Sequence, residues 1–228
     1  RLSTVLSLER LKGIQKVNED GTTYVHDDFL RWLHYTLTGI NQPIVLPNNP
    51  SYIDCLIGGC DLTGGTVPLI GNQFIKIVAI DNFPFESSPG ILAKLTELPI
   101  NYRWNTRFIF LDQHEAVGLI EKYRRKWRQK IRSLGEQILR THSGQVNQDA
   151  MMMVGDCDQA LLEVNCGAVA MGLFTSNVIL MDEDKEKVES SAMQVQKTLG
   201  ALGFPARIED VNTLDAFFGT LPGHGVEN

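Results

Sequence analysis

A glycine-rich segment, Gly58–Gly65, is the first place in the sequence where phosphate chemistry could occur. Backbone N–H groups of such a loop can bind a nucleotide phosphate, but a P-loop also needs a lysine and a hydroxyl residue after its last glycine. Here Thr66 and Val67 follow, and neither Gly-Lys-Ser nor Gly-Lys-Thr occurs in the 228 residues. We therefore interpret the segment as a flexible turn and expect this chain not to hydrolyse ATP by itself.

Metal and nucleophile chemistry also lack an established pattern in this sequence. The five histidines form no His-Glu-x-x-His or His-x-Glu pair, and no Gly-x-Ser-x-Gly motif is present. The cysteines Cys55, Cys60, Cys157 and Cys166 lack the two-residue spacing of zinc ribbons and redox motifs. We interpret them as free thiols in a reducing compartment and expect no catalytic, cofactor-binding or metal-binding residue here.

The strongest charged feature is a run of basic residues with only apolar or neutral residues between them. Its members are Lys122, Arg124, Arg125, Lys126, Arg128, Lys130 and Arg132. On a helix, we expect them to fill the face opposite Tyr123, Trp127 and Ile131. Such a face is either solvated and paired with acids elsewhere, or a docking surface for an acidic partner or anionic lipid headgroups. Nucleic acid is a weaker alternative, because no exposed aromatic platform is expected beside the basic residues.

Composition is that of an ordinary globular protein. With 228 residues, 43% of them hydrophobic, the chain can bury one large core or two small ones. Its net charge of −6 argues against general nucleic-acid binding, since an acidic surface repels phosphates. No run of about 18 apolar residues occurs, so we expect no membrane-spanning segment. Because the chain opens on Arg1 and ends abruptly at Asn228, we expect a fragment of a longer cytosolic protein.

Hydrophobic periodicity predicts the helices and strands that must position these residues. Helices are expected at Asp28–Leu37, Pro89–Leu98, about 113–141, about 148–170 and after Asp182–Asp184, and strands at Gln73–Asp81, Tyr102–Leu111, Leu173–Met181 and Pro205–Val211. The helix from about residue 113 has apolar residues at steps of three and four, as a helix lying on a core requires. They are Val117, Ile120, Tyr123, Trp127, Ile131, Leu134 and Ile138.

This order of elements predicts an α+β fold with two layered βαβ-type subregions of ferredoxin-like character, joined by a long helical hairpin. We expect an N-terminal α+β segment over residues 1–66, a strand–helix–strand unit over 67–112, the hairpin over 113–170 and a second strand–helix–strand unit over 171–228. One compact domain overall is the alternative organisation.

Several sequence blocks recur together from about Asp20 to the end of the chain. They are His26–Arg31, Val78–Asp81, Leu98–Trp104, Arg107–Asp112, Lys122–Trp127, Leu180–Asp184 and Leu221–Asn228. At their intervals, these blocks resemble the N-terminal region of the CagE/TrbE/VirB family of type IV secretion ATPases. The combination is far more specific than any one block.

The resemblance implies a protein of two regions. An N-terminal α+β region would dock at the cytoplasmic face of the bacterial inner membrane. Its partners would be inner-membrane type IV secretion subunits, including a short membrane-anchoring subunit, and neighbouring copies of itself. A C-terminal RecA-like motor, with Walker motifs beyond Asn228, would hydrolyse ATP with Mg²⁺ to drive pilus assembly and substrate transfer. No position of this chain matches the motor motifs, so no catalytic residue is carried over.

Two alternatives stay open beside a non-catalytic assembly domain for conjugative transfer. A stand-alone enzyme could assemble a site around Cys55, Cys60 and Asp61. A nucleic-acid-binding module could use the basic helix at residues 122–132. The assembly domain is preferred, with that basic helix as a contact surface.

Overall fold

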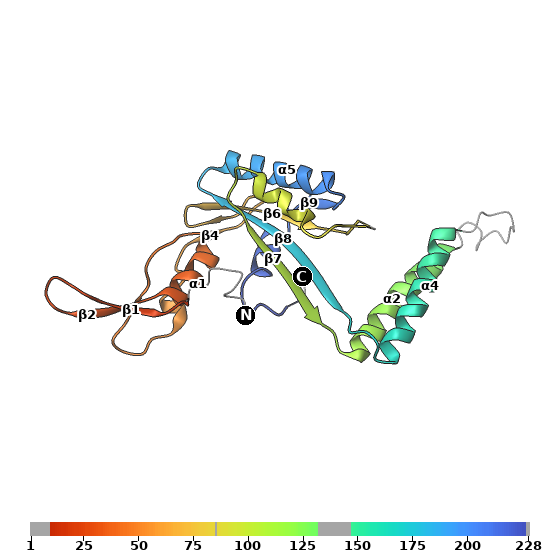
Figure 1. Ribbon diagram of the computed structural model, residues 1–228, viewed down its shortest axis with the longest axis horizontal. Coiled ribbons are helices and arrows are strands. Elements are labelled where there is room, and N and C mark those ends of the chain that lie inside the picture. Colours follow the sequence, from red (N-terminus) through yellow and green to blue (C-terminus); the bar gives the residue numbers. More distant parts are fainter. Residues whose placement is uncertain (1–9, 85, 132–146, 227–228) are drawn as a thin grey trace. The chain divides into compact units, whose positions relative to one another are not determined.

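The computed structural model describes residues 10–84, 86–131 and 147–226, which form two compact units (Figure 1). The first unit combines the described residues up to Thr106 with those from Ser176 onward, and the second lies within Arg107–Thr175. Strands β7 (Arg103–Phe110) and β8 (Gly172–Asp182) connect the units covalently. Helices and mostly antiparallel strands are both abundant, so the predicted α+β class is confirmed.

The main sheet of the first unit is built around two long strands. β6 (Gln73–Ile80) pairs antiparallel with β8, from Phe74 opposite Asp182 to Ala79 opposite Asn177. β7 lies on the far side of β8, and β9 (Ala206–Ile208) pairs antiparallel with β6. Two short strands, β4 (Leu62–Thr63) and β5 (Leu69–Ile70), extend the sheet beyond β6.

The two predicted strand–helix–strand segments share this one sheet. The first is β6, the 3₁₀ helix η3 (Ile91–Glu97) and β7, and the second is β8, α5 (Lys185–Ala201) and β9. Their strands interleave in the order β9, β6, β8, β7, the ferredoxin-like arrangement. They do not stack as two layers, because each segment alone leaves a sheet with unpaired edges, and pairing β6 with β8 satisfies both.

The alternation of side chains along β6 and β8 buries both faces of the sheet. On one face, Val78 and Leu180 pack against α5 and η3. The expected inward residues of α5 are confirmed, with Val188, Ala192, Val195 and Leu199 all at most 1% exposed. On the other face, a second cluster packs against the short helix α6 (Thr213–Phe218). Its buried members are Ile70, Ile75, Ile77, Ile179, Ala216 and Phe217.

The N-terminal region of the first unit is a small antiparallel sheet with one helix. Strands β1 (Gly13–Val17), β2 (Thr23–Asp27) and β3 (Val45–Leu46) pair in that order. Helix α1 (Asp28–Thr38) follows β2 directly, because the side chain of Asp27 accepts a hydrogen bond from the N–H of Leu30 and caps it. A 3₁₀ turn, η2 (Ile53–Cys55), lies further along the chain.

The second unit contains the predicted pair of long helices, which lie side by side in Figure 1. Helix α2 spans Gln113–Ile131 and α4 spans Gln148–Asn165, five residues short of the expected end. Their contact is built on buried Ala116, Ile120 and Val164. The expected continuation of the first helix to residue 141, with Leu134 and Ile138, lies outside the described residues.

One member of the predicted apolar stripe is wrongly assigned. Tyr123 is 51% exposed, although Ile120 and Ala116 of the same helix are buried. Its ring lies beneath the ammonium group of Lys126, with 5.5 Å between the nitrogen and the ring centroid. With only α4 to cover it, α2 buries a narrow seam, and Tyr123 falls at its edge.

A buried histidine links α1 to the glycine-rich segment. His34 is 1% exposed, and its Nδ1 accepts a hydrogen bond from the N–H of Gly58 at 3.2 Å. Its Nε2 is buried and has no hydrogen-bond partner among the described residues. Burial lowers the pKa of His34 below its ordinary value of 6.5, because the charged imidazolium loses its hydration. The glycines therefore form a turn that is held by a neutral imidazole.

We expect the free energy of unfolding to fall between about pH 7 and pH 5, more steeply than in the variant His34→Gln. The unfolded chain binds a proton at His34 near pH 6.5, whereas the folded chain resists it, so acid favours unfolding. Glutamine keeps an acceptor for the Gly58 N–H but does not titrate. Urea unfolding at stepwise pH measures the difference, and equal pH slopes for both chains would contradict the assignment.

Candidate functional site

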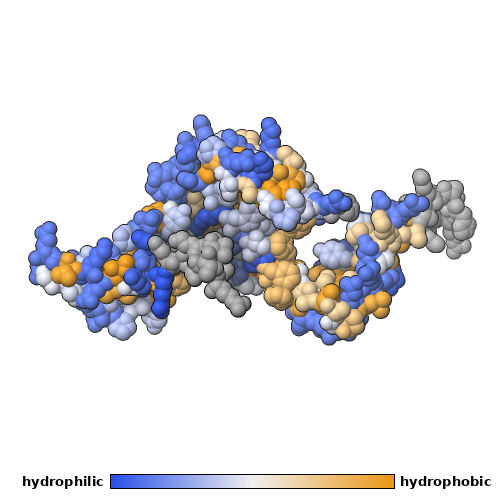
Figure 2. Space-filling view, viewed as in Figure 1, coloured by the Kyte–Doolittle hydropathy of each residue, from blue (hydrophilic) through white to orange (hydrophobic). Residues whose placement is uncertain are grey.

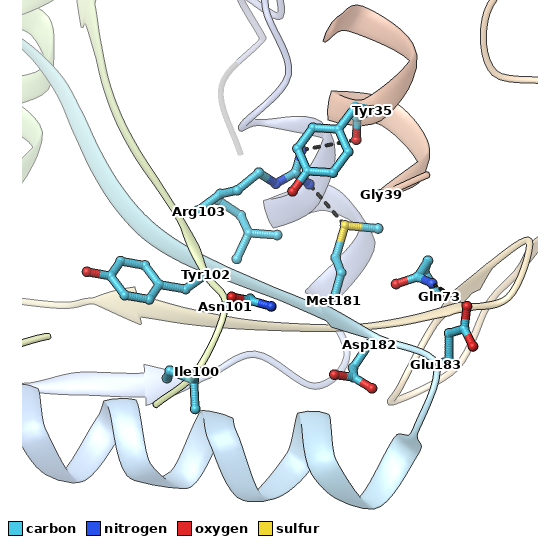
Figure 3. A pocket seen from close by; sticks show the side chains of 11 residues that line it. Tyr35, Gly39, Gln73, Ile100, Asn101, Tyr102, Arg103, Met181, Asp182 and Glu183 are labelled. Atoms are coloured by element: carbon cyan, nitrogen blue, oxygen red, sulfur yellow. Dashed lines mark hydrogen bonds between the residues drawn. The ribbon is translucent and has the colours of Figure 1, made fainter. Parts of the chain in front are cut away.

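A polar cleft of ≈ 530 Å³ opens in the first unit, where α1 ends and where β6 begins and β8 ends (Figure 3). Residues from these elements and from the segment leading into β7 line it. They are Tyr35, Gly39, Gln73, Ile100, Asn101, Tyr102, Arg103, Ile179, Met181, Asp182 and Glu183. Because the main-sheet strands and α1 are far apart in the sequence, the cleft exists only when the first unit is folded.

Arg103 is the central charged group of the cleft and ties α1 to the main sheet. Its Nη1 donates to the backbone carbonyls of Thr36 (2.8 Å) and Tyr35 (3.5 Å), and its Nη2 donates to the sulfur of Met181 (3.0 Å). The guanidinium also lies over the Tyr35 ring, 5.6 Å from the centroid. A cation at the last carbonyls of a helix satisfies acceptors that have no partner within the helix. Burial lowers the pKa of Arg103.

The end of α1 needs a glycine at this point. Gly39 has φ = +75°, and its N–H donates to the Tyr35 carbonyl at 2.8 Å, which ends the helix. A Cβ added there would lie 2.9 Å from Cε of Met181. Gly39 therefore allows both the left-handed turn and the close approach of Met181, the side chain that also accepts from Arg103.

The acidic rim of the cleft is already paired. Asp182 forms an ion pair with Lys187, whose hydrogen bond lowers the pKa of Asp182, and the same hydrogen bond raises the pKa of Lys187. The carboxylate of Glu183 accepts from the side-chain amide of Asn72 at 2.7 Å. These contacts fasten the end of β8 to the start of α5, which Asp184 caps.

The arrangement of the cleft supports structure more than catalysis. Its lining residues include no serine, cysteine, histidine or lysine, so they offer no nucleophile beside a base. Among the residues that the structure describes, no group of three or more His, Cys, Asp or Glu side chains could hold a metal ion. The cleft is a junction between α1 and the main sheet.

The basic residues singled out in the sequence lie on α2. Lys122, Arg125, Lys126, Arg128 and Lys130 are exposed, and Arg132 lies outside the described residues. Arg124 alone turns toward α4, with its Nε 2.7 Å from Oδ1 of Asp158. Lys130 lies over the ring of Trp127, 4.5 Å from its centroid. Figure 2 shows hydrophilic and hydrophobic residues side by side on the visible face of this helix pair.

The sequence relates this structure to a known family. Residues 14–225 match the family model described as "CagE, TrbE, VirB family, component of type IV transporter system". This chain belongs to the CagE/TrbE/VirB family.

Two relatives of this CagE/TrbE/VirB family protein are named for conjugal transfer. "Conjugal transfer protein TrbE" of Rhizobium radiobacter is 39% identical over 229 residues, which cover 100% of this chain and 28% of the relative. A probable conjugal transfer protein TrbE of Sinorhizobium fredii is 39% identical over 223 residues, which cover 97% of this chain and 34% of the relative. The chain thus spans about a third of the length of these relatives or less.

The cysteines of this family member are dispersed. Cys55 is exposed in η2, while Cys60 is half-buried and packs against the cluster around Ile70. The carbonyl of Asp61 accepts from the N–H of Gly71 at 2.9 Å. Cys157 and Cys166 lie in or beside α4 in the second unit, and all four thiols are free. Within the described residues of the CagE/TrbE/VirB protein, no helix is both long and apolar enough to cross a membrane.

Sequence reasoning assigned no role to Arg103 or His34. A lone arginine at the start of an otherwise apolar strand was the available signal for Arg103. Its partners Thr36 and Met181 are 67 and 78 residues away, so no local pattern could identify them.

Replacing Arg103 with lysine is expected to lower the free energy of unfolding of this CagE/TrbE/VirB chain by about 1–3 kcal/mol, the range for hydrogen bonds to charged groups. A lysine lacks the planar fork that reaches two carbonyls and the sulfur together. Hydrogen exchange should accelerate most in α1.

Arg31→Lys on the same helix is the matched control. Arg31 is an exposed partner of Asp28 at 3.6 Å, so its replacement should change stability by less than about 0.5 kcal/mol. Equal losses in urea unfolding for the two variants would show that Arg103 does not hold α1.

Proposed function

We propose that this chain is the non-catalytic assembly domain of a type IV secretion ATPase, and that it docks the ATPase motor on the inner-membrane channel of a conjugative transfer system. One observation carries the proposal. The whole chain aligns with conjugal transfer proteins but covers only 28% and 34% of them, and its 228 residues contain no Gly-Lys-Ser or Gly-Lys-Thr. ATP hydrolysis then belongs to a region of the full-length protein outside this chain.

The geometry of the site supports docking more than chemistry. The cleft pairs its own charges, and the described residues hold no metal-ligand cluster. In contrast, most basic side chains of α2 point away from the core of their unit and stay exposed. Exposed charge on a rigid helix can select a partner and its orientation without a deep pocket.

The partners that suit this role are the inner-membrane subunits of the channel, including a short membrane-anchoring subunit, and other copies of the chain. The family is a component of a type IV transporter system, which supports a membrane-associated assembly. We propose the cytoplasmic face of the bacterial inner membrane as its place of action. Anionic lipid headgroups are a further ligand class for the basic helix, because each exposed lysine or arginine near such a surface contributes about 1 kcal/mol.

The direct test is co-purification of the tagged 228-residue chain with each inner-membrane channel subunit in mild detergent. We expect at least one subunit to be retained, because docking is the task proposed for this region of the protein. An unrelated domain of the same fold class serves as the control bait. If a correctly folded chain retains none of the subunits, docking is not its role.

ATP turnover separates the assembly role from an enzymatic one. The purified chain should hydrolyse no Mg-ATP above the buffer rate, whereas the chain extended through the rest of the natural protein should be active. The physical reason is that a phosphate-binding lysine is needed to neutralise the β and γ phosphates, and the Gly58–Gly65 turn has none. Turnover by the 228 residues alone would place a motor inside this chain and refute the division of labour.

A further inference from the structure

Helices α2 and α4 carry opposite charge. α2 has six basic and two acidic side chains, whereas α4 has four acidic side chains and no basic one. Only one described ion pair joins the two helices, Arg124 with Asp158. Attraction within the hairpin therefore accounts for one charge on each helix, and the other charges face elsewhere.

The remaining acids of α4 form a stripe on its outer side. Asp149, Asp156 and Glu163 follow one another at seven-residue intervals, which turns the helix by only about 20° per step. Asp149 and Asp156 are exposed, and neither has an ion pair with another described residue. Ala150 and Val164, which are buried, mark the side that faces α2. We call Asp149, Asp156 and Glu163 the acidic stripe.

The basic side chains lie on the outer side of α2. Lys122, Lys126 and Lys130 are spaced four residues apart, and Arg125 lies beside them. All four are exposed, whereas Ala116 and Ile120 of the same helix are buried against α4. We call these four residues the basic face. The hairpin thus presents positive charge on one outer side and negative charge on the other.

The two charged sides also match in height along the hairpin. The N–H of Asn147 donates to the carbonyl of Ile131 at 3.5 Å, and Arg124 meets Asp158, so the helices run antiparallel in a defined register. In that register Lys130 is level with Asp149, and Arg125 is level with Asp156. Two hairpins side by side in the same orientation would therefore bring opposite charges together.

Both sides carry exposed apolar groups beside their charges. On α4, Met152 is 64% exposed and Leu162 is 71% exposed. On α2, Tyr123 is 51% exposed, next to Lys126. Apolar contact supplies affinity that exposed ion pairs alone lack, while the charges select the partner and its register.

We propose that the basic face of α2 binds the acidic stripe of α4 in a second copy of this chain. The contact uses two different surfaces, so it repeats from copy to copy and either closes into a ring or continues as a row. This inference rests on the proposed assembly role and names the partner of its basic helix. An anionic membrane would account for the basic face but not for a matched acidic stripe on the opposite side.

Sedimentation velocity of the full 228-residue chain tests the contact, at concentrations from about 1 to 100 µM. We expect association at about 50 mM salt and weaker association at about 500 mM, where the charges are screened. The variant R125E/K130E makes both sides acidic, and D149K/D156K makes both sides basic. Each variant alone should associate at least about tenfold more weakly than the unaltered chain. An equimolar mixture should recover association, because every junction again joins opposite charges.

Matched controls carry the same change of net charge elsewhere on the chain. K185E/K197E reverses two exposed lysines of α5, and E19K/E86K reverses two exposed acids of the first unit. Both controls should associate as the unaltered chain does. Circular dichroism confirms folding of each variant, which matters most for D149K/D156K because Asp149 stabilises the first turn of α4.

Several outcomes would overturn the inference. They are a chain that stays monomeric throughout, charge-reversed variants that associate normally, a mixture that does not recover, and loss of binding to phosphatidylglycerol vesicles in R125E/K130E without any chain–chain association. A monomeric chain that still retains channel subunits overturns self-association but leaves docking intact. Charge-dependent association without subunit binding refutes docking alone.

Discussion

The first unit depends on the antiparallel pairing of β6 with β8. The six pairs between Phe74–Ala79 and Asn177–Asp182 join segments about a hundred residues apart in the chain. Both strands are covered on both faces, so each pair removes apolar side chains from water on two sides at once. Helices α5 and α6 have a surface to pack on only after this pairing exists. The cleft lies at its end, where Asp182 leaves the sheet and Gln73 enters it.

A similar economy of contact shapes the helix pair of the second unit. A seam of small and branched side chains, centred on Ala116, Ile120 and Val164, holds α2 against α4. Because each helix has one partner, most of its circumference stays in water, where charges cost little. Charge on the two outer sides is therefore unconstrained by folding and available for recognition. This separates the two physical tasks of the molecule, since apolar burial builds each unit while charge and exposed aromatic or methionine side chains mark its surfaces.

The accuracy of the sequence-based predictions followed the range of the interactions concerned. Helix α1 and helix α5 were predicted almost to the residue, because capping by Asp27 and Asp184 and a 3.6-residue apolar repeat act over a few positions. Strands β6, β7 and β8 were located for the same reason. Their order in one sheet was not, because strand pairing has no local signature when a hairpin separates the strands. Tyr123 was placed in the seam because periodicity predicts a stripe but not the width that one neighbouring helix covers.

What the sequence determined by itself is the set of elements, the family and the lack of a phosphate-binding lysine, since each is a property of residue types at short spacing. Tertiary structure alone decided which distant groups meet. Arg103 reaches the end of α1, and Lys76, 5% exposed in β6, pairs with Asp210 at 2.7 Å across 134 residues. A charged group inside a fold must find a partner to offset lost hydration, and packing determines which one is near. The same holds for α2 and α4, whose charges became two opposite sides only when the hairpin closed.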